Sequence, residues 1–545
     1  MRHEAASIPL RVSEALHPNE RSASPSTASA AVSQAVRSAP EEFPAALGRS
    51  SPLVITDERL LNYQRCTRRA FLDVFGPSDQ QDPPSDYLLK LHQDSSNHQR
   101  AVITEHNAIT PHYPHHNWEA GAKATLAIMQ QGVEAISHGV ILRQRPDGVT
   151  LVSRPKLLIK QPGWSYFGNW VYLPADIKLG KRPKADYQVV SAFHAYVLAE
   201  VQGAWTETSW LILRQGNVYE VNLVDQLPKM QEILEGCIHM MRDQREPAVF
   251  IARNRCDLCQ WFSHCYGVAQ REQHLSLLPG VTPSRYHYLH GLNLTTVEAL
   301  AATTPAQLEP LPGFGAQVAH RLVRQAQATH HQRAMPTFDA PHPTALPSRL
   351  NDWLPTAPVE LYFDIEAAPE RELIYLHGVL VVDRRTGQDT FHPLLATSPE
   401  DEQAIWEQFL ALTHQYPDAP IFHFCPYEAQ TVKKLARLYD VPEDAIQPLI
   451  DRFVDLHDCV VSTTTLPIES YALKSIARWL GFEWRDSGAN GAQSIYWYDQ
   501  WLVTGDRTFL DTILRYNEDD CRATWHVKDW LVAFLQEHYP QSTIK

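Results

Sequence analysis

The C-terminal third of the chain contains two pairs of residues whose side chains could hold divalent metal ions. Asp364 and Glu366 alternate with apolar residues in LYFDIEA, so on a strand both carboxylates point to the same face. Tyr516 and Asp520 are four residues apart in RYNEDDCRATWHVKDWL, which reads as a helix, and they share one of its faces. Buried neighbouring carboxylates are costly unless a cation lies between them. The pattern predicts a divalent metal site, and two metal ions about 4 Å apart can activate a water for phosphodiester hydrolysis.

Cysteines form a second group that could bind metal. Cys256, Cys259 and Cys265 have the spacing C-x2-C-x5-C, and Cys66 lies far upstream. A structural zinc site usually has two nearby pairs of ligands, and a second pair is missing here. Three buried structural thiols with an unrelated Cys66 are the alternative. Four further cysteines are predicted to be ordinary core or surface thiols: Cys237, Cys425, Cys459 and Cys521.

Several domains are needed to position these groups, because 545 residues are too many for one ordinary hydrophobic core. Strand-like and helix-like segments alternate in two regions, which predicts an α/β multidomain protein. Two Pro-Gly turns, each followed by a helical pattern, lie between these regions. The predicted parts are a disordered Ala/Ser/Pro-rich tail at 1–50, an α/β domain at 51–275, a small helical hairpin module at 276–332, a Pro-rich linker at 333–358 and a second α/β domain at 359–545.

Charge and composition limit the function classes. The chain has 48 Lys and Arg against 62 Asp and Glu, which disfavours a protein that coats nucleic acid by general positive charge. The acidic excess lies at 359–545, with 15 basic and 30 acidic residues. No stretch is apolar for long enough to cross a membrane, and no secretory signal peptide or regular disulfide pattern is visible. We therefore expect a soluble protein of the reducing cytoplasm.

Four phrases of the C-terminal region carry a resemblance when taken in order. FDIEA, FHFCPYEAQTVKKL, DLHDCVV with SYALKSIARWLGF, and YNEDDCRAT resemble the ribonuclease H-like exonuclease domain of the DEDD type, as in YprB-like proteins. The resemblance implies that Asp364, Glu366 and Asp520 bind Mg²⁺ or Mn²⁺ and that Tyr516 orients the attacking water. At the second motif, where the family has Asp, this chain has Glu428.

Two other carboxylates of these phrases have less defined roles. Asp519, next to the predicted ligand, is expected to be an exposed neighbour. Asp455 in VDLHD is either an acidic residue that supports the site or a turn residue.

One distant cysteine with three clustered ones resembles the iron-sulfur nuclease domains of the RecB family. The resemblance implies a 4Fe-4S cluster on Cys66, Cys256, Cys259 and Cys265, with Zn²⁺ as the alternative. It also implies a PD-(D/E)xK restriction-endonuclease-like core for 51–275. The predicted second catalytic group comprises His98, Asp176, Lys178 and Gln188.

This predicted second site departs from its family at Lys156, where the family has Asp. A cation cannot replace a carboxylate ligand and repels the metal, so we expect the site to be weak or inactive. Lys181, Arg182 and Lys184 follow the same strand and are predicted to hold phosphates, although a solvated basic face is the alternative.

The segment LPGFGAQVAHRLVRQAQA in the middle module resembles a helix-hairpin-helix element. Gly313 and Gly315 would let backbone N–H groups at a helix start meet a phosphate without sequence preference. A plain pair of helices is the alternative.

The order of the parts over residues 53–535 is similar to a family of RecB-like nucleases. The resemblance implies a metal-dependent nuclease, a 3′–5′ exonuclease acting through Asp364, Glu366, Glu428 and Asp520, with an N-terminal region that binds nucleic acid. The rival hypothesis is a non-catalytic nucleic-acid-binding protein with two degenerate nuclease folds. The sequence leaves open DNA or RNA, strandedness, pathway, protein partners and oligomeric state.

Overall fold

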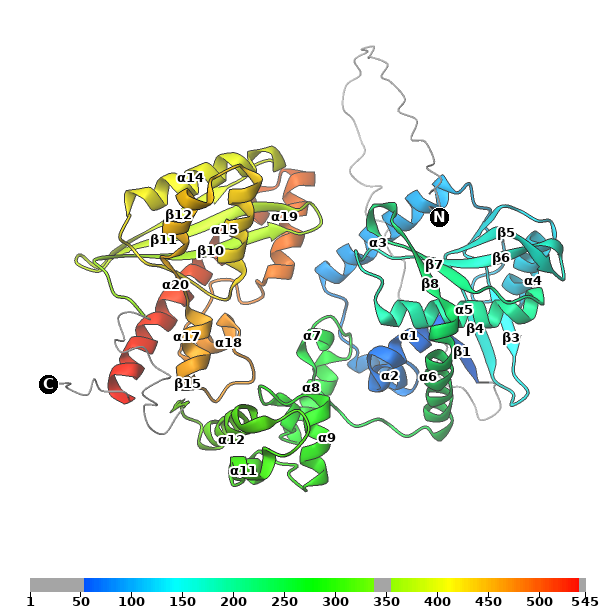
Figure 1. Ribbon diagram of the computed structural model, residues 1–545, viewed down its shortest axis with the longest axis horizontal. Coiled ribbons are helices and arrows are strands. Elements are labelled where there is room, and N and C mark those ends of the chain that lie inside the picture. The colour runs from blue at the N-terminus through cyan, green and yellow to red at the C-terminus, as the bar shows by residue number, and fades with distance from the viewer. Residues whose placement is uncertain (1–52, 338–353, 539–545) are drawn as a thin grey trace, which may run out of the picture. The chain divides into compact units, whose positions relative to one another are not determined.

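The computed structural model describes residues 53–337 and 354–538 (Figure 1). The predicted tail at 1–50 and the middle of the predicted linker therefore lie outside the described residues. None of the helices in the described part of the chain has the length and apolar character needed to span a membrane.

The first part of the described chain alternates helices and strands, as the sequence predicts. Its elements are β1 (Val54–Thr56), α1 (Asp57–Arg65), α2 (Thr67–Phe75), η2 (Ser78–Gln80), α3 (Asp86–Glu105), α4 (Trp118–Gln130), β2 (Ala135–Ser137), β3 (Ile141–Gln144), β4 (Thr150–Ser153), β5 (Leu157–Ser165), β6 (Gly168–Ile177), α5 (Ala185–Gln202), β7 (Thr208–Ile212), η3 (Arg214–Gly216), β8 (Val218–Asn222) and α6 (Leu223–Asp243). Five strands form a sheet of order β2-β5-β6-β7-β8, and β1, β4 and β3 form a smaller sheet.

Helix α5 is the central helix of this part. It packs against β6 and β7 of the larger sheet and against β3 and β4 of the smaller one. Most of its residues are buried, which explains its nearly continuous apolar sequence. It ends at Gly203, whose φ of 67° is the left-handed conformation that glycine adopts at helix ends.

The middle of the chain is helical. Its elements are α7 (Arg253–Cys256), α8 (Phe262–Arg271), η4 (Leu275–Leu277), α9 (Pro283–Gly291), α10 (Val297–Ala301), α11 (Pro305–Leu308), α12 (Gly315–His331) and β9 (Met335–Pro336). Apolar residues from α9 to α12 share one small core.

The second α/β part contains a sheet of order β12-β11-β10-β13-β14, in which β10 to β12 are antiparallel and β10, β13 and β14 are parallel. Its elements are β10 (Val359–Ala368), β11 (Leu373–Asp383), β12 (Gln388–Leu395), η5 (Pro399–Asp401), α14 (Glu402–Gln415), β13 (Ile421–His423), α15 (Tyr427–Leu438), α16 (Glu443–Ile450), β14 (Phe453–Asp455), α17 (Leu456–Thr463), β15 (Thr464–Thr465), α18 (Leu473–Trp479), α19 (Gly491–Thr504) and α20 (Arg507–His538).

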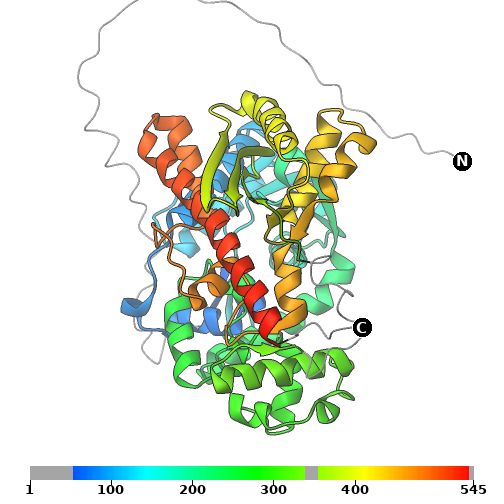
Figure 2. The ribbon, with the colours of Figure 1, turned by 90° about the vertical axis from the view of Figure 1, so that its left-hand side faces the viewer.

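The two faces of this sheet have separate cores. Leu361, Phe363 and Ile365 pack with α14, α15 and α16 on one face. Tyr362, two residues before Asp364, packs with α17, α18 and α20 on the other. Figure 2 shows the long helix α20, which packs against β10 and β11. The strand alternation thus directs Asp364 and Glu366 towards α20.

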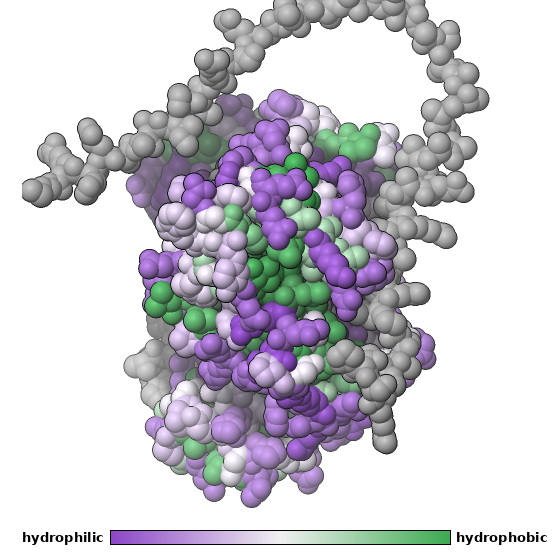
Figure 3. Space-filling model, turned by 90° about the vertical axis from the view of Figure 1, so that its right-hand side faces the viewer, coloured by the Kyte–Doolittle hydropathy of each residue, from purple (hydrophilic) through white to green (hydrophobic). Residues whose placement is uncertain are grey.

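Surface hydrophobicity is uneven in the first part of the chain. Figure 3 shows one face on which hydrophobic residues gather in the middle, with hydrophilic residues around them. The most exposed large aromatic residues are Trp164 and Tyr166, which are 83% and 78% exposed where β5 turns into β6.

Candidate active site

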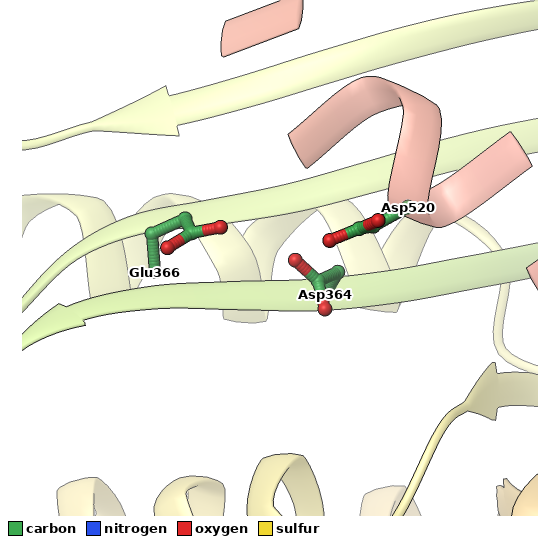
Figure 4. Close-up of side chains that lie close together, drawn as sticks. All are labelled: Asp364, Glu366 and Asp520. Carbon is green, nitrogen blue, oxygen red and sulfur yellow. The ribbon is translucent and has the colours of Figure 1, made fainter. Parts of the chain in front are cut away.

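Three of the predicted metal ligands lie together between β10 and α20. Asp364 and Glu366 project from β10 towards Asp520 on α20 (Figure 4). Each offers a carboxylate oxygen, and these atoms all lie within 4.8 Å of one another. Glu366 and Asp520 are buried and Asp364 is partly exposed, so the cluster is open at Asp364. Hard divalent cations such as Mg²⁺ and Mn²⁺ prefer oxygen ligands of this kind, so the donor set fits them.

Neutral hydrogen-bond donors orient these carboxylates. Asn517 Nδ2 donates to Asp364 Oδ2 over 2.6 Å, and Trp484 Nε1 donates to Asp520 Oδ1 over 2.7 Å. Ser494 hydrogen-bonds to Glu366. These donors fix the orientation of the carboxylates without adding the positive charge that would compete with a metal.

A glycine of the neighbouring strand makes room for one of these donors. Gly378 lies opposite Asp364 in the register of β10 and β11. A Cβ at Gly378 would lie 1.7 Å from Asn517 Oδ1, so any other residue would displace the Asn517 side chain. We infer that the close approach of α20 to the sheet requires glycine here.

Burial and nearby carboxylates raise the pKa of each carboxyl group in the cluster. Burial and the charge of Asp520 raise the pKa of Glu366 to about 8. Burial raises the pKa of Asp520 to about 6, although Trp484 and Lys474 act in the opposite direction. Burial and the neighbouring carboxylates raise the pKa of Asp364 well above its usual range. A bound divalent cation would reverse these shifts, because it stabilises the ionised carboxylates.

Glu428 lies beside this cluster but outside the group of three. It is buried in the first turn of α15, and its charge raises the pKa of Asp364. Its Oε2 is 3.4 Å from His423 Nδ1 and has no hydrogen-bond partner. Cys425, three residues before Glu428, has a φ of 78°, which is a rare conformation for a residue other than glycine. Glu428 is therefore near enough to act on Asp364, but it is not one of the three carboxylates whose oxygens lie within 4.8 Å of one another.

The structure distinguishes the other two acidic residues of the motif phrases. Asp455 caps α17, where its side chain accepts from the backbone N–H groups of His457 and Asp458. It also accepts from Cys425 N over 3.0 Å. The expectation that Asp519 is an exposed neighbour is wrong. Asp519 is 3% exposed and binds Arg485 Nε over 2.8 Å, because its position on α20 faces inward.

Tyr516 is one turn before Asp520 on α20 and is buried with it. The two side chains are hydrogen-bonded, and burial together with the negative charge of Asp520 raises the pKa of Tyr516 strongly. The phenol therefore stays neutral and remains able to donate a proton in a hydrogen bond.

Sequence reasoning missed several residues of this site: Gly378, Lys474, Trp484, Ser494 and Asn517. Asn517 lies inside the quoted phrase YNEDD, so its position beside Tyr516 was an available signal. Lys474 lies inside SYALKSIARWLGF, and Trp484 follows it. Their contacts with the site depend on how α18 and the segment after it approach α20, which spacing alone does not reveal.

In the predicted second site, around Asp176, the carboxylate is paired with a lysine of the chain itself. Lys178 Nζ lies 3.0 Å from Asp176 Oδ2 at the end of β6, and His194 Nε2 lies 3.6 Å from the same oxygen. His194 Nδ1 in turn shares a 2.8 Å hydrogen bond with Ser153 Oγ. Burial alone would raise the pKa of Asp176, but Lys178 and His194 outweigh it and lower the pKa. Asp176 is thus a carboxylate that already has the Lys178 ammonium as its counter-charge.

The remaining residues predicted for the second site have other contacts in the structure. His98 is near Leu213 and Arg214 beyond β7, and its Nε2 is buried without a hydrogen-bond partner. Gln188 donates to Pro183 O over 2.9 Å and accepts from Gln226. The charge of Lys156 acts on His138, whose pKa is lowered by burial and by this lysine.

The basic run after β6 lies at the surface. Lys181, Arg182 and Lys184 are exposed, and Lys184 Nζ is 5.9 Å from the ring centre of Tyr187. Lys178 Nζ is 5.0 Å from the same ring centre. The basic run therefore comes directly after the Asp176–Lys178 ion pair in the sequence.

The four clustered cysteines come from segments that are almost 200 residues apart in the sequence. Cys66 lies between α1 and α2, and it is near enough to Cys256, Cys259 and Cys265 to raise the pKa of each of these thiols. Burial raises the pKa of Cys259 to about 11, while Arg69 opposes the shift. Among the described residues, no three of these sulfur atoms lie within 4.8 Å of one another.

The two glycines of the middle module precede and begin α12. Gly313 and Gly315 have φ values of 80° and 65°, which disfavour other residues. No described atom lies within 4 Å of a Cβ built at either position, so the turn is open to its surroundings. Arg285 Nε donates to Gly313 O over 3.0 Å and holds the turn in place.

Comparisons with known proteins bear on the C-terminal part. The comparison with curated proteins found no match. The sequence model of the RNase H superfamily matches residues 361–532, a range that includes all three clustered carboxylates and Glu428. The resemblance predicted for this part is confirmed at this level: residues 361–532 form an RNase H-like domain, which suggests nuclease-type activity.

Proposed function

We propose that the chain is a metal-dependent nuclease and that its C-terminal site removes nucleotides from the 3′ end of a nucleic acid. The observation that carries this proposal is the group of three carboxylates in an RNase H-like domain. Asp364, Glu366 and Asp520 would hold the divalent metal, with Glu428 as a further oxygen ligand. The metal would supply stabilisation of the charge that develops on the phosphate and would lower the pKa of a water.

The residues of the chain provide the remaining functions. The neutral Tyr516 hydroxyl, which is hydrogen-bonded to Asp520, would orient the attacking water. The water oxygen forms the new bond to phosphorus, the bond from phosphorus to the 3′-oxygen breaks, and that oxygen takes up a proton. The products are a nucleoside 5′-monophosphate and a chain that is one nucleotide shorter.

A half-exposed aromatic residue beside the carboxylates is suited to binding the substrate. Tyr427 is 47% exposed at the start of α15. Its pKa is raised mainly by burial and also by the charges of three nearby carboxylates, Glu428, Glu366 and Asp364. A base of a single strand can stack on such a ring without sequence preference. This favours a single-stranded end as the substrate.

The upstream part would bind the strand. Lys181, Arg182 and Lys184 offer exposed positive charge, and the open turn at Gly313 and Gly315 offers backbone N–H groups at the start of α12. Phosphate contacts of both kinds do not depend on sequence. The C-terminal region has twice as many acidic as basic residues, so it needs such help to hold a polyanion.

The four cysteines would hold a 4Fe-4S cluster that joins the start of the N-terminal part to its end. Tetrahedral zinc with bonds of about 2.3 Å would bring the sulfur atoms within about 4 Å of one another. Among the described residues, no three of these sulfur atoms lie within 4.8 Å of one another, so they do not have the zinc spacing. Protein purified without oxygen should show visible absorbance and contain iron, and colourless protein that contains zinc would identify the alternative.

The test of the nuclease proposal is an assay on end-labelled single-stranded DNA and RNA with Mg²⁺ or Mn²⁺. The parent should shorten the strand from its 3′ end, and Asp364→Ala should not. Asp444→Ala is a matched control, because Asp444 is an exposed carboxylate of α16 away from the cluster. Equal cleavage by the parent and Asp364→Ala, or no cleavage by either, would contradict the proposal.

A second candidate function is nucleic-acid binding without turnover. The observation that favours it is the Asp176–Lys178 pair, which leaves the N-terminal site neutralised. If the parent binds an oligonucleotide but cleaves none, this candidate is supported. Lys156→Asp should then create activity that Lys178→Ala removes, and the absence of any change would contradict our explanation for the weakness of this site.

A further inference from the structure

Lys474 of α18 lies at the edge of the carboxylate cluster and has no role in the chemistry described so far. It is partly exposed, so a ligand can reach it. Its positive charge lowers the pKa of both Glu366 and Asp520, which places the ammonium within electrostatic range of two of the three clustered carboxylates.

Contacts on three sides fix the position of this ammonium. Lys474 Nζ donates a hydrogen bond to Ala489 O. It lies 4.6 Å from the ring centre of Tyr516 and 5.5 Å from that of Trp484. Both rings belong to residues that hydrogen-bond to Asp520. The cation is therefore held beside the site rather than carried on a free side chain, which lowers the entropy cost of binding an anion.

Lys474 is not consumed by an ion pair. No carboxylate oxygen of the described residues lies within 4.0 Å of its Nζ, although two clustered carboxylates are near. Two other cations of this domain have a direct carboxylate partner. Lys528 Nζ lies 2.7 Å from Glu360 Oε1, and Arg485 Nε lies 2.8 Å from Asp519 Oδ1. A positioned, partly exposed and unpaired ammonium beside a metal site is suited to an oxygen anion of the substrate.

We propose that Lys474 binds a non-bridging oxygen of the scissile phosphate and stabilises the charge that develops there. The inference rests on the proposed nuclease function and adds a catalytic residue to it. The contact is a charge-assisted hydrogen bond, and no covalent bond is made or broken at the lysine. A preorganised cation of this kind acts where charge develops, and the removal of one such donor typically slows turnover by about 100- to 1000-fold.

The first experiment compares variants of the full chain on an end-labelled single strand with Mn²⁺. Lys474→Met should lower kcat by about 100-fold. Lys474→Arg should retain more activity than Lys474→Met, because it keeps the charge. Lys433→Met is the matched control, since Lys433 is an exposed lysine of α15, and it should behave like the parent. Turnover of Lys474→Met within twofold of the parent would overturn the proposal.

A calorimetric titration with Mn²⁺ alone separates phosphate binding from a structural role. Removal of a cation beside the carboxylates should leave Mn²⁺ affinity unchanged or increase it, because like charges repel. Loss of turnover with equal or tighter Mn²⁺ binding supports the proposal. A parallel loss of Mn²⁺ affinity would show that Lys474 only maintains the shape of the site, which overturns it.

A binding measurement keeps this inference distinct from the proposed function. A fluorescent phosphorothioate oligothymidylate with Ca²⁺ is the probe, and Lys474→Met should weaken its binding about tenfold. If the parent cleaves no substrate but shows this difference, the proposed function fails and the role of Lys474 as a phosphate ligand stands. If the parent cleaves and the variant equals it in both assays, the function stands and the inference about Lys474 fails.

Discussion

Asp176 in the N-terminal part is a buried carboxylate, and the group of Asp364, Glu366 and Asp520 in the RNase H-like domain is buried except at Asp364. The negative charge of the two sites is balanced differently. Asp176 has Lys178 at 3.0 Å and His194 at 3.6 Å, and its pKa is lowered. The clustered carboxylates have mainly neutral donors, and their pKa values are raised.

The difference shows which site requires an added cation. A buried carboxylate with its own ammonium is already compensated, and a divalent ion would have to displace that ammonium. Three carboxylates held by an amide, an indole and a hydroxyl have no cation within 4.0 Å among the described residues, and Lys474 compensates them only in part, so they either take up protons or bind a metal. The same residue type therefore indicates a closed ion pair in one region and a metal site in the other.

The largest expected effect concerns metal binding. Asp520→Asn removes one of three ligands and should weaken Mn²⁺ binding by more than the roughly 100-fold loss that follows removal of a hydrogen-bond partner of a ligand. Asp176→Asn should leave Mn²⁺ binding unchanged. Titration calorimetry on the full chain measures both, and equal losses in the two variants would remove the distinction between the sites.

The next effect concerns stability. Asp176→Asn leaves the partly buried Lys178 ammonium without its partner, so we expect a loss of about 3 kcal/mol in the free energy of unfolding. Asp364→Asn should instead stabilise the metal-free protein, because it relieves repulsion among carboxylates. Denaturant titrations in the presence of EDTA compare the two variants. A destabilised Asp364→Asn would count against the repulsion that we describe.

A smaller effect is expected from the donors that orient the carboxylates. Trp484→Phe keeps an aromatic ring but removes the N–H group that binds Asp520. Loss of such a partner typically costs 10- to 100-fold in metal affinity or activity. Trp479→Phe serves as the control, since Trp479 lies at the end of α18 and contacts Trp530 rather than the carboxylates. Equal activities of the two variants would show that the indole N–H is dispensable.

The smallest expected effect is a dependence of stability on pH. The pKa values of Glu366 and Asp520, about 8 and about 6, lie above their ordinary values, so the folded state binds more protons than the unfolded state. The stability of the metal-free protein should therefore fall as the pH rises from about 5 to 8. Asp176 has a lowered pKa, so its contribution is lost only in acid, outside this window.

Thermal unfolding with EDTA at pH 6 and pH 8.5 tests this dependence. Each 1 kcal/mol lost from the free energy of unfolding should lower the midpoint temperature of thermal unfolding by about 2–4 °C for a domain of this size. Saturating Mn²⁺ should remove most of the difference, since it replaces the bound protons. An equal fall with Mn²⁺ present would mean that the clustered carboxylates do not bind the metal.

Much of the RNase H-like domain could be predicted from sequence. The alternation around Asp364 and Glu366 fixes their common face, because side chains on a strand have a period of two. The four-residue spacing of Tyr516 and Asp520 places their side chains on one face of a helix. The spacing could not predict the environment of Asp519. Asp519 lies in the same acidic run as Asp520, but only the packing of α20 turns its side chain towards Arg485 and away from solvent.

The sequence by itself determined which residues could ligate a metal, and the confirmed family resemblance over 361–532 follows from the same phrases. Tertiary structure decided how their charges are balanced, because Lys178 reaches Asp176 directly whereas Trp484 and Asn517 bring neutral groups to the clustered carboxylates. Local patterns arise from backbone geometry, which acts over a few residues. The balance of charge depends on side chains that are far apart in the sequence and meet only when the chain is folded.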